Sequence, residues 1–388
     1  MFCLAATLLS LLVPHALCGD REDELERKWG YDWAFSGIST FGHLPHVRCL
    51  TQPQETFDIG IIGVPFDTAV SFRPGARMGP RSIRAASGRH LVNRGFHAEA
   101  NVNPYESWAR IIDCGASDVP VTPFDNAVAM EQMTTALTEL GDRQTAFTGD
   151  AALRVPPLSK PRLLILGGDH LVALPALRAL RAVHGEPVAL LHFDSHLDTL
   201  HPDRYPSAWP SEQASFNHGS VFWKAVQEGL LRNSSCVHAG INTRLSGGSR
   251  DDLDSDDGLG FVRIPADAVD EIGVSGVVKA IRDRIEPGVK TYISIDIDVL
   301  DPAFAPGTGA PEPGGWSTRE LIRILRGLKG LDIVGADIVE VAPAYDTPGS
   351  DTAFVAAALG YEILTLMVKN HLDSAQTIGL ETEFRTEL

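Results

Sequence analysis

The sequence predicts an α/β protein built as three layers, with helices on both faces of a parallel sheet of about eight strands. Two observations lead to this prediction. Short apolar runs alternate along the chain with segments of helical periodicity, and strands connected through helices pair in parallel. The chain has 388 residues, of which 44% are hydrophobic, so it can bury a large core, and it contains no internal repeat.

The clearest predicted strand is Val289–Ile295, which is short and rich in β-branched and aromatic residues, as expected for a buried parallel strand. The first strand begins at Phe57 and ends in a turn near Pro65, and a loop rich in Pro, Gly and Arg follows at 72–81. Further strands are expected at 110–114, 163–166, 188–193, 236–241, 261–264 and 333–339.

The intervening segments have helical patterns. We expect helices at 81–91, 125–140, 171–183, 219–231, 275–285, 317–328 and 351–371. The segment 141–161 contains several prolines and interrupts the alternation, which predicts a mobile surface insertion. Nothing marks a boundary between two domains. We expect a signal peptide, an N-terminal arm, one main domain and a C-terminal tail, at 1–18, 19–55, 56–372 and 373–388 respectively.

An apolar run opens the chain and predicts a secretory signal peptide. Residues 1–18 precede a charged segment that starts at Asp20. The run is shorter than the ~20 residues of a bilayer-spanning helix, and Ala16-Leu17-Cys18 resembles a cleavage site. No Lys or Arg precedes the run, so a membrane anchor or a misassigned start remain alternatives. We expect a secretory or extracellular protein without membrane attachment after cleavage.

Three cysteines, Cys49, Cys114 and Cys236, follow that segment. This odd and small number does not indicate a disulfide framework. Because Cys114 ends one predicted strand and Cys236 opens another, we expect both to be buried free thiols. Asn233 begins an Asn-Ser-Ser sequon, which predicts a glycosylation site if the chain is secreted.

The charge of the chain limits its partners. The net charge is −17 and the pI is near 5.1. Nucleic-acid binding requires basic patches, so a nucleic-acid partner is not expected. An acidic surface suits a small cationic ligand.

Two carboxylates follow the strand at 289–295. Asp296 and Asp298 leave it on one face, because side chains two positions apart in an extended chain point the same way. Crowded carboxylates in a poorly hydrated crevice repel each other and require protons or cations. Standing alone, they could simply begin a solvated turn at Asp301-Pro302.

Two more strand ends carry similar residues. The strand at 188–193 is followed by Asp194, His196 and Asp198, again two positions apart, and the glycine turn after another strand ends in His170. Ligands of parallel α/β sheets gather at the carboxyl ends of the strands. Carboxylates and imidazoles are metal ligands. The sequence therefore predicts a metal site at this edge of the sheet.

Seven segments extend the pattern. They read Arg-Pro-Gly-Ala-Arg at 73–77, Gly-Pro-Arg at 79–81, Gly-Gly-Asp-His at 167–170, Asp-Ser-His-Leu-Asp at 194–198, Asn-His-Gly-Ser at 217–220, Ser-Ile-Asp-Ile-Asp at 294–298 and Glu-Val-Ala-Pro at 340–343. Together they resemble the signatures of the ureohydrolases, the arginase and agmatinase family, and the agmatinase branch is the most similar. The resemblance covers roughly residues 30–372. Ser195 stands where the family usually has Ala, and the 141–161 insertion is longer than is typical.

The resemblance implies an arginase-like fold with two Mn²⁺ per subunit. The ligands would be His170, Asp194, Asp198 and Asp296 for one ion and His196, Asp194, Asp296 and Asp298 for the other. Asp194 and Asp296 would bridge the two ions. Four carboxylates would balance two divalent charges, and this ligand set suits Mn²⁺ without excluding Fe²⁺, Co²⁺ or Zn²⁺. Two such ions can lower the pKa of a shared water, which would attack a guanidinium carbon.

The resemblance also implies that His218, Glu340 and Asp198 are catalytic. A histidine in a loop is usually a surface residue, but in this motif His218 would pass a proton to the leaving amine. Glu340 would hold the planar guanidinium through bidentate pairing. We expect His192, inside a strand, to be structural and Asp169 to orient its neighbours.

We expect hydrolysis of agmatine to urea and putrescine, with 4-guanidinobutyrate or arginine as alternatives. Arginine needs donors for its α-carboxylate, and the segment 199–206 differs from the arginase pattern. A different dinuclear hydrolase, such as a metallophosphatase, would want Arg or Asn donors beside the metals, which these motifs lack. A non-catalytic metal-binding descendant would not need His218 and Glu340. The resemblance further implies a homo-oligomer.

Overall fold

The computed structural model describes residues 38–386, except 116–117, 151–154, 205–210, 212–216 and 247–248. The predicted signal peptide and most of the predicted N-terminal arm therefore lie outside the described residues. Residues 39–388 form one unit, and the fold described below is that of this unit.

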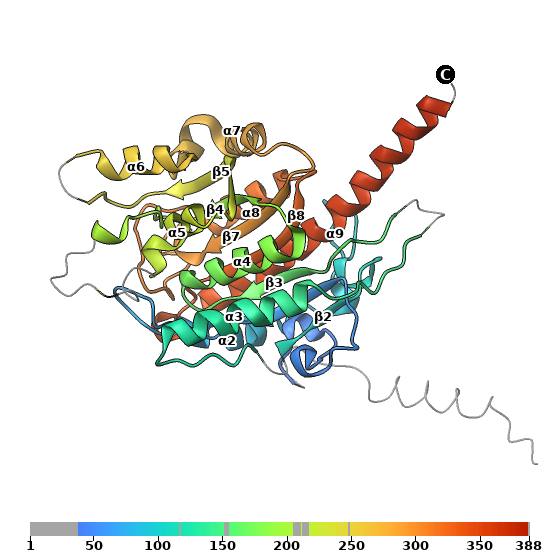
Figure 1. The fold of residues 1–388 in the computed structure, drawn as a ribbon, viewed down its shortest axis with the longest axis horizontal. Coiled ribbons are helices and arrows are strands. Elements are labelled where there is room, and N and C mark those ends of the chain that lie inside the picture. The colour runs from blue at the N-terminus through green and yellow to red at the C-terminus, as the bar shows by residue number, and fades with distance from the viewer. Residues whose placement is uncertain are drawn as a thin grey trace, which may run out of the picture. The chain divides into compact units, whose positions relative to one another are not determined.

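One parallel sheet organises this unit (Figure 1). Its eight strands in the described residues have the order β2-β1-β3-β8-β7-β4-β5-β6, and every pairing is parallel. The strands are β1 (Ile59–Gly63), β2 (Ile111–Asp113), β3 (Arg162–Leu166), β4 (Val188–Phe193), β5 (Leu231–Ile241), β6 (Phe261–Pro265), β7 (Lys290–Asp296) and β8 (Asp332–Val339). The predicted parallel sheet of about eight strands is confirmed.

Helices cover both faces of the sheet, which confirms the three-layer prediction. Within β3, Leu164 and Leu166 pack into one hydrophobic cluster, whereas Leu163 and Ile165 pack into the other, because successive strand residues point to opposite faces. The first cluster includes residues of α2 (Gly79–Ser87), α7 (Ala268–Arg284), α8 (Thr318–Gly327) and α9 (Asp351–Thr386). The second includes residues of α3 (Asn126–Gly141), α4 (Ala173–His184) and α5 (Val221–Gln227).

The helices differ most from the prediction at three places. Sequence reasoning missed α6 (Asp251–Leu259), because the segment is rich in Asp and lacks an apolar stripe; its early acidic residues instead suit the positive end of a helix dipole. Helix α7 begins at Ala268 rather than near 275 and has a non-helical residue, Gly273, with φ of 68°. Helix α9 continues to Thr386, beyond the expected end near 371.

Helix α9 belongs to the core of the unit. Its segment Asp351–Ala375 is the only helix in the described residues that is long and apolar enough to cross a bilayer, and 72% of its most apolar window is buried in the protein. Burial of this kind is typical of a core helix, so its composition needs no membrane to explain it.

The described parts of the 141–161 segment are held against the domain rather than free. The Phe147 amide donates to Asp58 Oδ1 at 2.9 Å, and the Phe147 ring lies 5.3 Å from the Trp108 ring. Asp150 and Val155 exchange backbone hydrogen bonds of 2.9 and 3.0 Å. The described part of this segment has exposed residues, as predicted for a surface insertion, and is bonded to the domain, whereas the mobility of the insertion stays a prediction.

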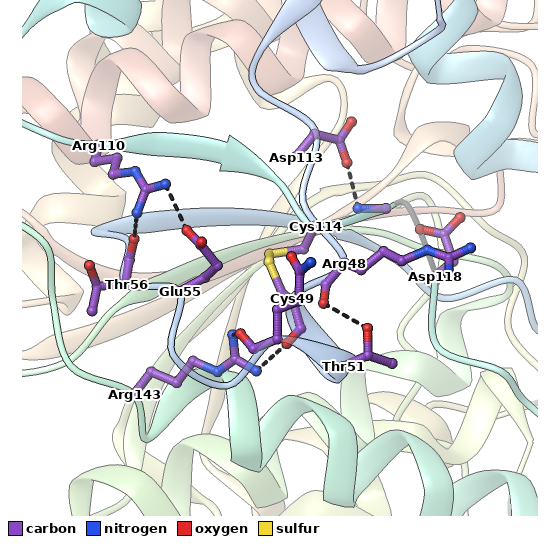
Figure 2. Close-up of a disulfide and its surroundings, with 12 residues drawn as sticks. Arg48, Cys49, Thr51, Glu55, Thr56, Arg110, Asp113, Cys114, Asp118 and Arg143 are labelled. Atoms are coloured by element: carbon purple, nitrogen blue, oxygen red, sulfur yellow. Dashed lines mark hydrogen bonds and ion pairs between the residues drawn. A yellow bond between two sulfur atoms is a disulfide. The ribbon is translucent and has the colours of Figure 1, made fainter.

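A disulfide joins the N-terminal arm to the edge of the sheet (Figure 2). Cys49 pairs with Cys114, 65 residues further along, with a Cα–Cα distance of 5.1 Å. The prediction that Cys114 is a free thiol is wrong. Its partner lies in a short 3₁₀ turn, and the preceding backbone is bonded to β2, where Val47 N donates to Asp113 O at 2.9 Å. Cys236 is a buried free thiol, as predicted.

Candidate active site

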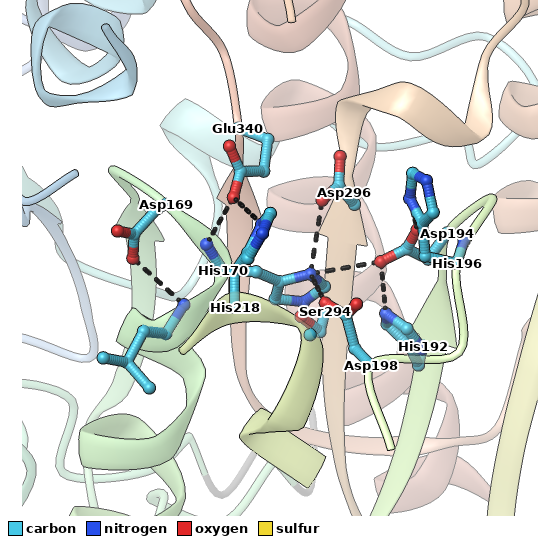
Figure 3. Close-up of polar contacts among 12 residues, drawn as sticks. Asp169, His170, His192, Asp194, His196, Asp198, His218, Ser294, Asp296 and Glu340 are labelled. Carbon is cyan, nitrogen blue, oxygen red and sulfur yellow. Dashed lines mark hydrogen bonds and ion pairs between the residues drawn. The ribbon is translucent and has the colours of Figure 1, made fainter. Parts of the chain in front are cut away.

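The residues predicted for metal binding and catalysis converge at the carboxyl ends of the central strands (Figure 3). The four central strands, β3, β8, β7 and β4, are neighbours in that order. Their carboxyl ends lead into His170, Glu340, the pair Asp296 and Asp298, and the segment 194–198, respectively. Sequence positions far apart are therefore adjacent because parallel strands end at the same edge.

His170 lies at the centre of a first group of ligand atoms. Its Nδ1 is 3.1 Å from Asp194 Oδ2 and 2.9 Å from Asp198 Oδ2. It is also 3.3 Å from Asp296 Oδ2. The ring is fully buried, and Nδ1 has no hydrogen-bond partner of good geometry in the described part of the chain. One nitrogen cannot satisfy three carboxylates, so this convergence fits a cation that they share.

The opposite side of the His170 ring is fixed by hydrogen bonds. Its Nε2 lies 2.8 Å from Ser294 Oγ, and Ser294 donates to Asp337 Oδ1 at 2.7 Å. The His170 backbone amide also donates to Glu340 Oε1 at 2.9 Å. These contacts hold the ring with Nδ1 towards the carboxylates, as partners of ligating histidines commonly do.

His196 forms a second group beside the first. Its Nδ1 is 3.3 Å from Asp194 Oδ1 and 3.1 Å from Asp298 Oδ2. The two oxygens of Asp194 thus face different histidines, which is the arrangement that a bridging ligand requires. Asp296 Oδ2 approaches His170, and its Oδ1 accepts from the Asp298 amide at 2.9 Å. Asp194 Oδ1 accepts from the His196 amide in the same way, at 2.5 Å.

The electrostatics of these carboxylates favour bound cations. Burial, followed by the charges of Asp298 and Asp194, raises the pKa of Asp296 well above its usual range. Burial and Asp194 likewise raise the pKa of Asp298 to about 7. Burial opposes ionisation of Asp194 too, but its histidine neighbours, first of all His192, hold its pKa well below the usual value. Carboxylates this crowded need protons or metal ions, and the donor set of carboxylates and imidazoles fits divalent metals.

His218 and Glu340 lie together beside the two groups. His218 Nδ1 is 3.4 Å from Glu340 Oε1, and its Nε2 is 2.8 Å from Ser71 Oγ. Burial alone would lower the pKa of His218, but Glu340, followed by Asp198 and Asp169, outweighs burial and raises it to about 9. The Ser71 amide also donates to His218 Nε2 at 3.0 Å, so in this geometry Nε2 accepts and Nδ1 faces Glu340.

Two of these residues have strained backbones. Asp198 has φ of 52° and Glu340 has φ of 59°, which is the left-handed region that residues other than Gly rarely adopt. Such a conformation costs of order 1–3 kcal/mol and persists where its surroundings fix it. At Glu340 the fixing contact is the bond from its amide to Gly168 O, at 2.8 Å.

Six of the predicted residues line a cavity of about 180 Å³, whereas His170 and Asp194 do not line it. Sequence reasoning missed several residues in its wall, among them Ser71, Arg244 and Asp252. Ser71 lies two positions before the recognised Arg73 motif, which could have drawn attention to it. Asp252 lies in α6, the helix that was not predicted, so no signal in the sequence placed it. His196, Asp198, His218, Asp296, Asp298 and Glu340 also line this cavity.

His192, expected to be structural, and Asp169, expected to orient its neighbours, both lie next to the site. His192 is fully buried in β4 and places its Nε2 2.8 Å from Asp194 Oδ2. Asp169 is buried and accepts from the amides of Ala69 and Leu171, at 2.8 and 3.1 Å. Both therefore position backbone or ligand groups next to the cavity.

Known proteins share this architecture over most of the chain. The model of the Arginase family matches residues 57–365. A Schizosaccharomyces pombe protein named "Putative agmatinase 1" is 48% identical over 87% of this chain and 84% of its own length. The guanidinopropionase of Pseudomonas aeruginosa is 37% identical over 88% of this chain and 95% of its own. The structure of proclavaminate amidino hydrolase from Streptomyces clavuligerus superposes with a TM-score of 0.72 at 33% identity, covering 88% of this chain and all of that one.

The fold and the site together define a ureohydrolase, an enzyme with a parallel α/β sheet and a cluster of Asp and His at the strand ends. The family match spans four-fifths of the chain, and the relatives are similar along nearly all of it. The chain belongs to the arginase family, which confirms the resemblance drawn from the sequence motifs.

Proposed function

We propose that the protein hydrolyses a linear guanidine, with agmatine as the first candidate, to urea and an amine, using two Mn²⁺ ions. The observation that carries the proposal is the position of Glu340 and His218 in the same cavity as the His/Asp cluster. A metal-binding protein without activity would need neither residue there. The name of the most similar relative reported above supports agmatine.

The six proposed metal ligands are His170, Asp194, His196, Asp198, Asp296 and Asp298. When bound, divalent ions at such a site act as Lewis acids and make water a stronger nucleophile at neutral pH. Side chains of the protein are proposed to bind the substrate and to transfer protons.

Glu340 is proposed to hold the substrate. Its carboxylate is nearly buried, with 4% of the residue exposed, and a planar guanidinium can pair with it through two parallel hydrogen bonds. Its Oε1 already accepts from the His170 amide, which fixes the carboxylate relative to the first ligand group. Glu340 therefore sets the position of the guanidinium carbon against the metal cluster.

Proton transfer completes the reaction. Water adds to the guanidinium carbon and loses a proton, which Asp198, in the cavity wall, can accept. The bond from carbon to the nitrogen of the tail then breaks. His218, with its raised pKa, supplies the proton that lets this nitrogen leave as an amine. The hydroxyl group on carbon loses its remaining proton as the carbonyl of urea forms, and the released amine takes up that proton.

The wall of the cavity carries two residues of opposite charge, which could interact with the tail of the substrate. Asp252 is 5% exposed, its Oδ2 accepts from the Ser246 amide at 2.7 Å and its Oδ1 lies 3.8 Å from Arg204 Nε. This fixed carboxylate in the cavity wall is the proposed partner of the ammonium group of agmatine. Arg244, also in the wall, would instead favour a carboxylate tail. This favours 4-guanidinobutyrate as the second candidate.

A urea-release assay with Mn²⁺ tests the substrate directly. Agmatine, 4-guanidinobutyrate, 3-guanidinopropionate and arginine share the guanidine and differ in the tail. We expect agmatine to give the highest kcat/KM, by up to roughly 10⁴-fold over arginine, since buried polar groups left unpaired discriminate strongly. A higher kcat/KM for arginine would contradict agmatine as the proposed substrate. If none of the four compounds released urea, the proposed guanidine hydrolysis would be wrong.

We also propose that the chain matures in the secretory pathway. The Cys49–Cys114 disulfide supports this location, because structural disulfides form and persist in oxidising compartments. Asn233, the first residue of the sequon, is exposed on β5 and accessible for a glycan. Both features agree with the signal peptide predicted at 1–18.

A further inference from the structure

A second polar row crosses the sheet directly below the strand ends. The strand register pairs His192 of β4 with His238 of β5, and His238 with Arg263 of β6. Residues paired in this way project from the same face of a sheet. This face is the one that carries Asp194, two positions after His192.

Direct contacts connect this row to the metal cluster. Asp194 Oδ2 lies 2.8 Å from His192 Nε2, and His192 Nδ1 lies 2.6 Å from His238 Nδ1. His238 Nε2 then lies 3.1 Å from Asp256 Oδ1, in α6. Arg263 Nη1 pairs with Asp256 Oδ2 at 2.5 Å and closes the chain of contacts.

The carboxylates at the two ends determine which ring nitrogens donate to them. Asp194 accepts from His192 Nε2, and Asp256 accepts from His238 Nε2. The two Nδ1 atoms then share one proton, so one of them donates to the other. Each ring has only one orientation in which all of these contacts are satisfied.

Packing holds the central ring in the same orientation. His238 is fully buried and stacks on Phe261, with ring centroids 4.1 Å apart and an interplanar angle of 8°. Asp256, also buried, accepts from Thr199 Oγ1 at 2.7 Å, and Thr199 directly follows Asp198. Asp256 therefore contacts Thr199, which is adjacent to the proposed ligand Asp198. It also connects through His238 and His192 to the proposed ligand Asp194.

Stability alone does not account for this arrangement. Buried polar groups must be desolvated, and well-packed apolar residues of similar size are often as stable or more stable. A network in which every member is satisfied does specify one geometry. The observations therefore favour a role in positioning over a role in stability.

We propose that His238 and Asp256 are positioning residues, which orient His192 and through it Asp194, so that the two Asp194 oxygens can serve both cation positions. The inference rests on the metal centre of the proposed function and adds two residues to it. Neither residue touches the cavity, and no ligand motif in the sequence includes them.

The test is the Mn²⁺ affinity of the metal-free full-length protein, measured by equilibrium dialysis with elemental analysis. His238→Phe retains an aromatic ring against Phe261 but removes both polar contacts, and we expect it to bind Mn²⁺ about 10–100-fold more weakly. His238→Asn restores an amide nitrogen near the Nδ1 position and should recover most of the affinity. Val237→Ala, on the opposite face of β5, is the matched control and should leave the affinity unchanged.

The outcomes separate this inference from the proposed function. If the unmodified protein binds no Mn²⁺, the proposed metal centre is wrong. If it binds Mn²⁺ and folded His238→Phe binds it within about twofold, or if His238→Asn is as weak as His238→Phe, the positioning role is wrong. Should His238→Phe not fold, Asp256→Asn provides the comparison, with a loss of about tenfold expected and an unchanged affinity contradicting the role.

Discussion

At the scale of single residues, the site depends on which atoms each carboxylate can reach. Asp194 directs one oxygen to His170 and the other to His196, whereas Asp298 approaches only His196. Substitutions at these two positions should therefore have different effects, even though both remove one negative charge.

Asp194→Asn should lose both metal ions, and Asp298→Asn should mainly lose the ion beside His196. An amide is a poorer ligand than a carboxylate and cannot balance the charge of a divalent ion. Elemental analysis of the purified variants measures the metal-to-protein ratio. Equal ratios for the two variants would contradict the assigned bridging role of Asp194.

His218→Ala should lower kcat by roughly 10²–10⁴-fold, because the leaving amine would lose its proton donor, while the metal content stays unchanged. The matched control is His201→Ala, a nearby histidine whose side chain is 45% exposed and which does not line the cavity. A parent-like kcat for His218→Ala would remove this residue from the mechanism.

The pH dependence of kcat should follow from the pair His218 and Glu340. Glu340 raises the pKa of His218 to about 9, so the protonated donor persists at neutral pH and is lost as the pH rises through that value. We expect kcat at saturating substrate to fall above about pH 9. In Glu340→Gln the charge is gone and burial remains, so the fall should begin at lower pH. An alkaline limb that does not move in this variant would show that another group controls it.

At the scale of elements, the periodicity of the sequence predicted the strands well but did not predict helix α6 or the disulfide. Apolar runs such as 188–193 stand out because both faces of a central strand are buried, and the metal motifs follow these strands directly. Helix α6 has no comparable signal, and its Asp252 and Asp256 could not be connected to the site without it. The disulfide was missed for a similar reason, since Cys49 lies in an irregular segment whose position depends on tertiary contacts.

The disulfide should stabilise the edge of the sheet without affecting the chemistry. It closes a loop of 65 residues, for which a chain-entropy argument gives about 4 kcal/mol, and disulfides typically contribute about 2–4 kcal/mol. We therefore expect Cys49→Ser to lower the free energy of unfolding by roughly 2–4 kcal/mol. Its strand, β2, is at the opposite edge of the sheet from β6 and outside the four central strands, so kcat should not change. Denaturant unfolding with and without reductant measures this effect. Reductant should destabilise the parent but not Cys49→Ser, and equal responses would contradict the bond.

At the scale of the whole molecule, the Cys49–Cys114 disulfide and the exposed Asn233 support the proposed secretory location. The expectation of a homo-oligomer stays a prediction that sizing of the purified protein can check. Native protein from a secreting host should begin near Gly19 and lose mass on glycosidase treatment unless Asn233 is replaced by Gln. A native chain that still begins at Met1 and carries no glycan would contradict the proposed location.

The central claim is that two metal ions support guanidine hydrolysis at the ends of β3, β4 and β7. The most direct measurement is a titration of the metal-free protein with Mn²⁺, in which bound metal and urea release from agmatine are followed in the same samples. We predict that urea release is absent without metal and reaches its maximum at two bound ions per chain. Full activity in the metal-free protein, or a maximum at one bound ion, would contradict the account.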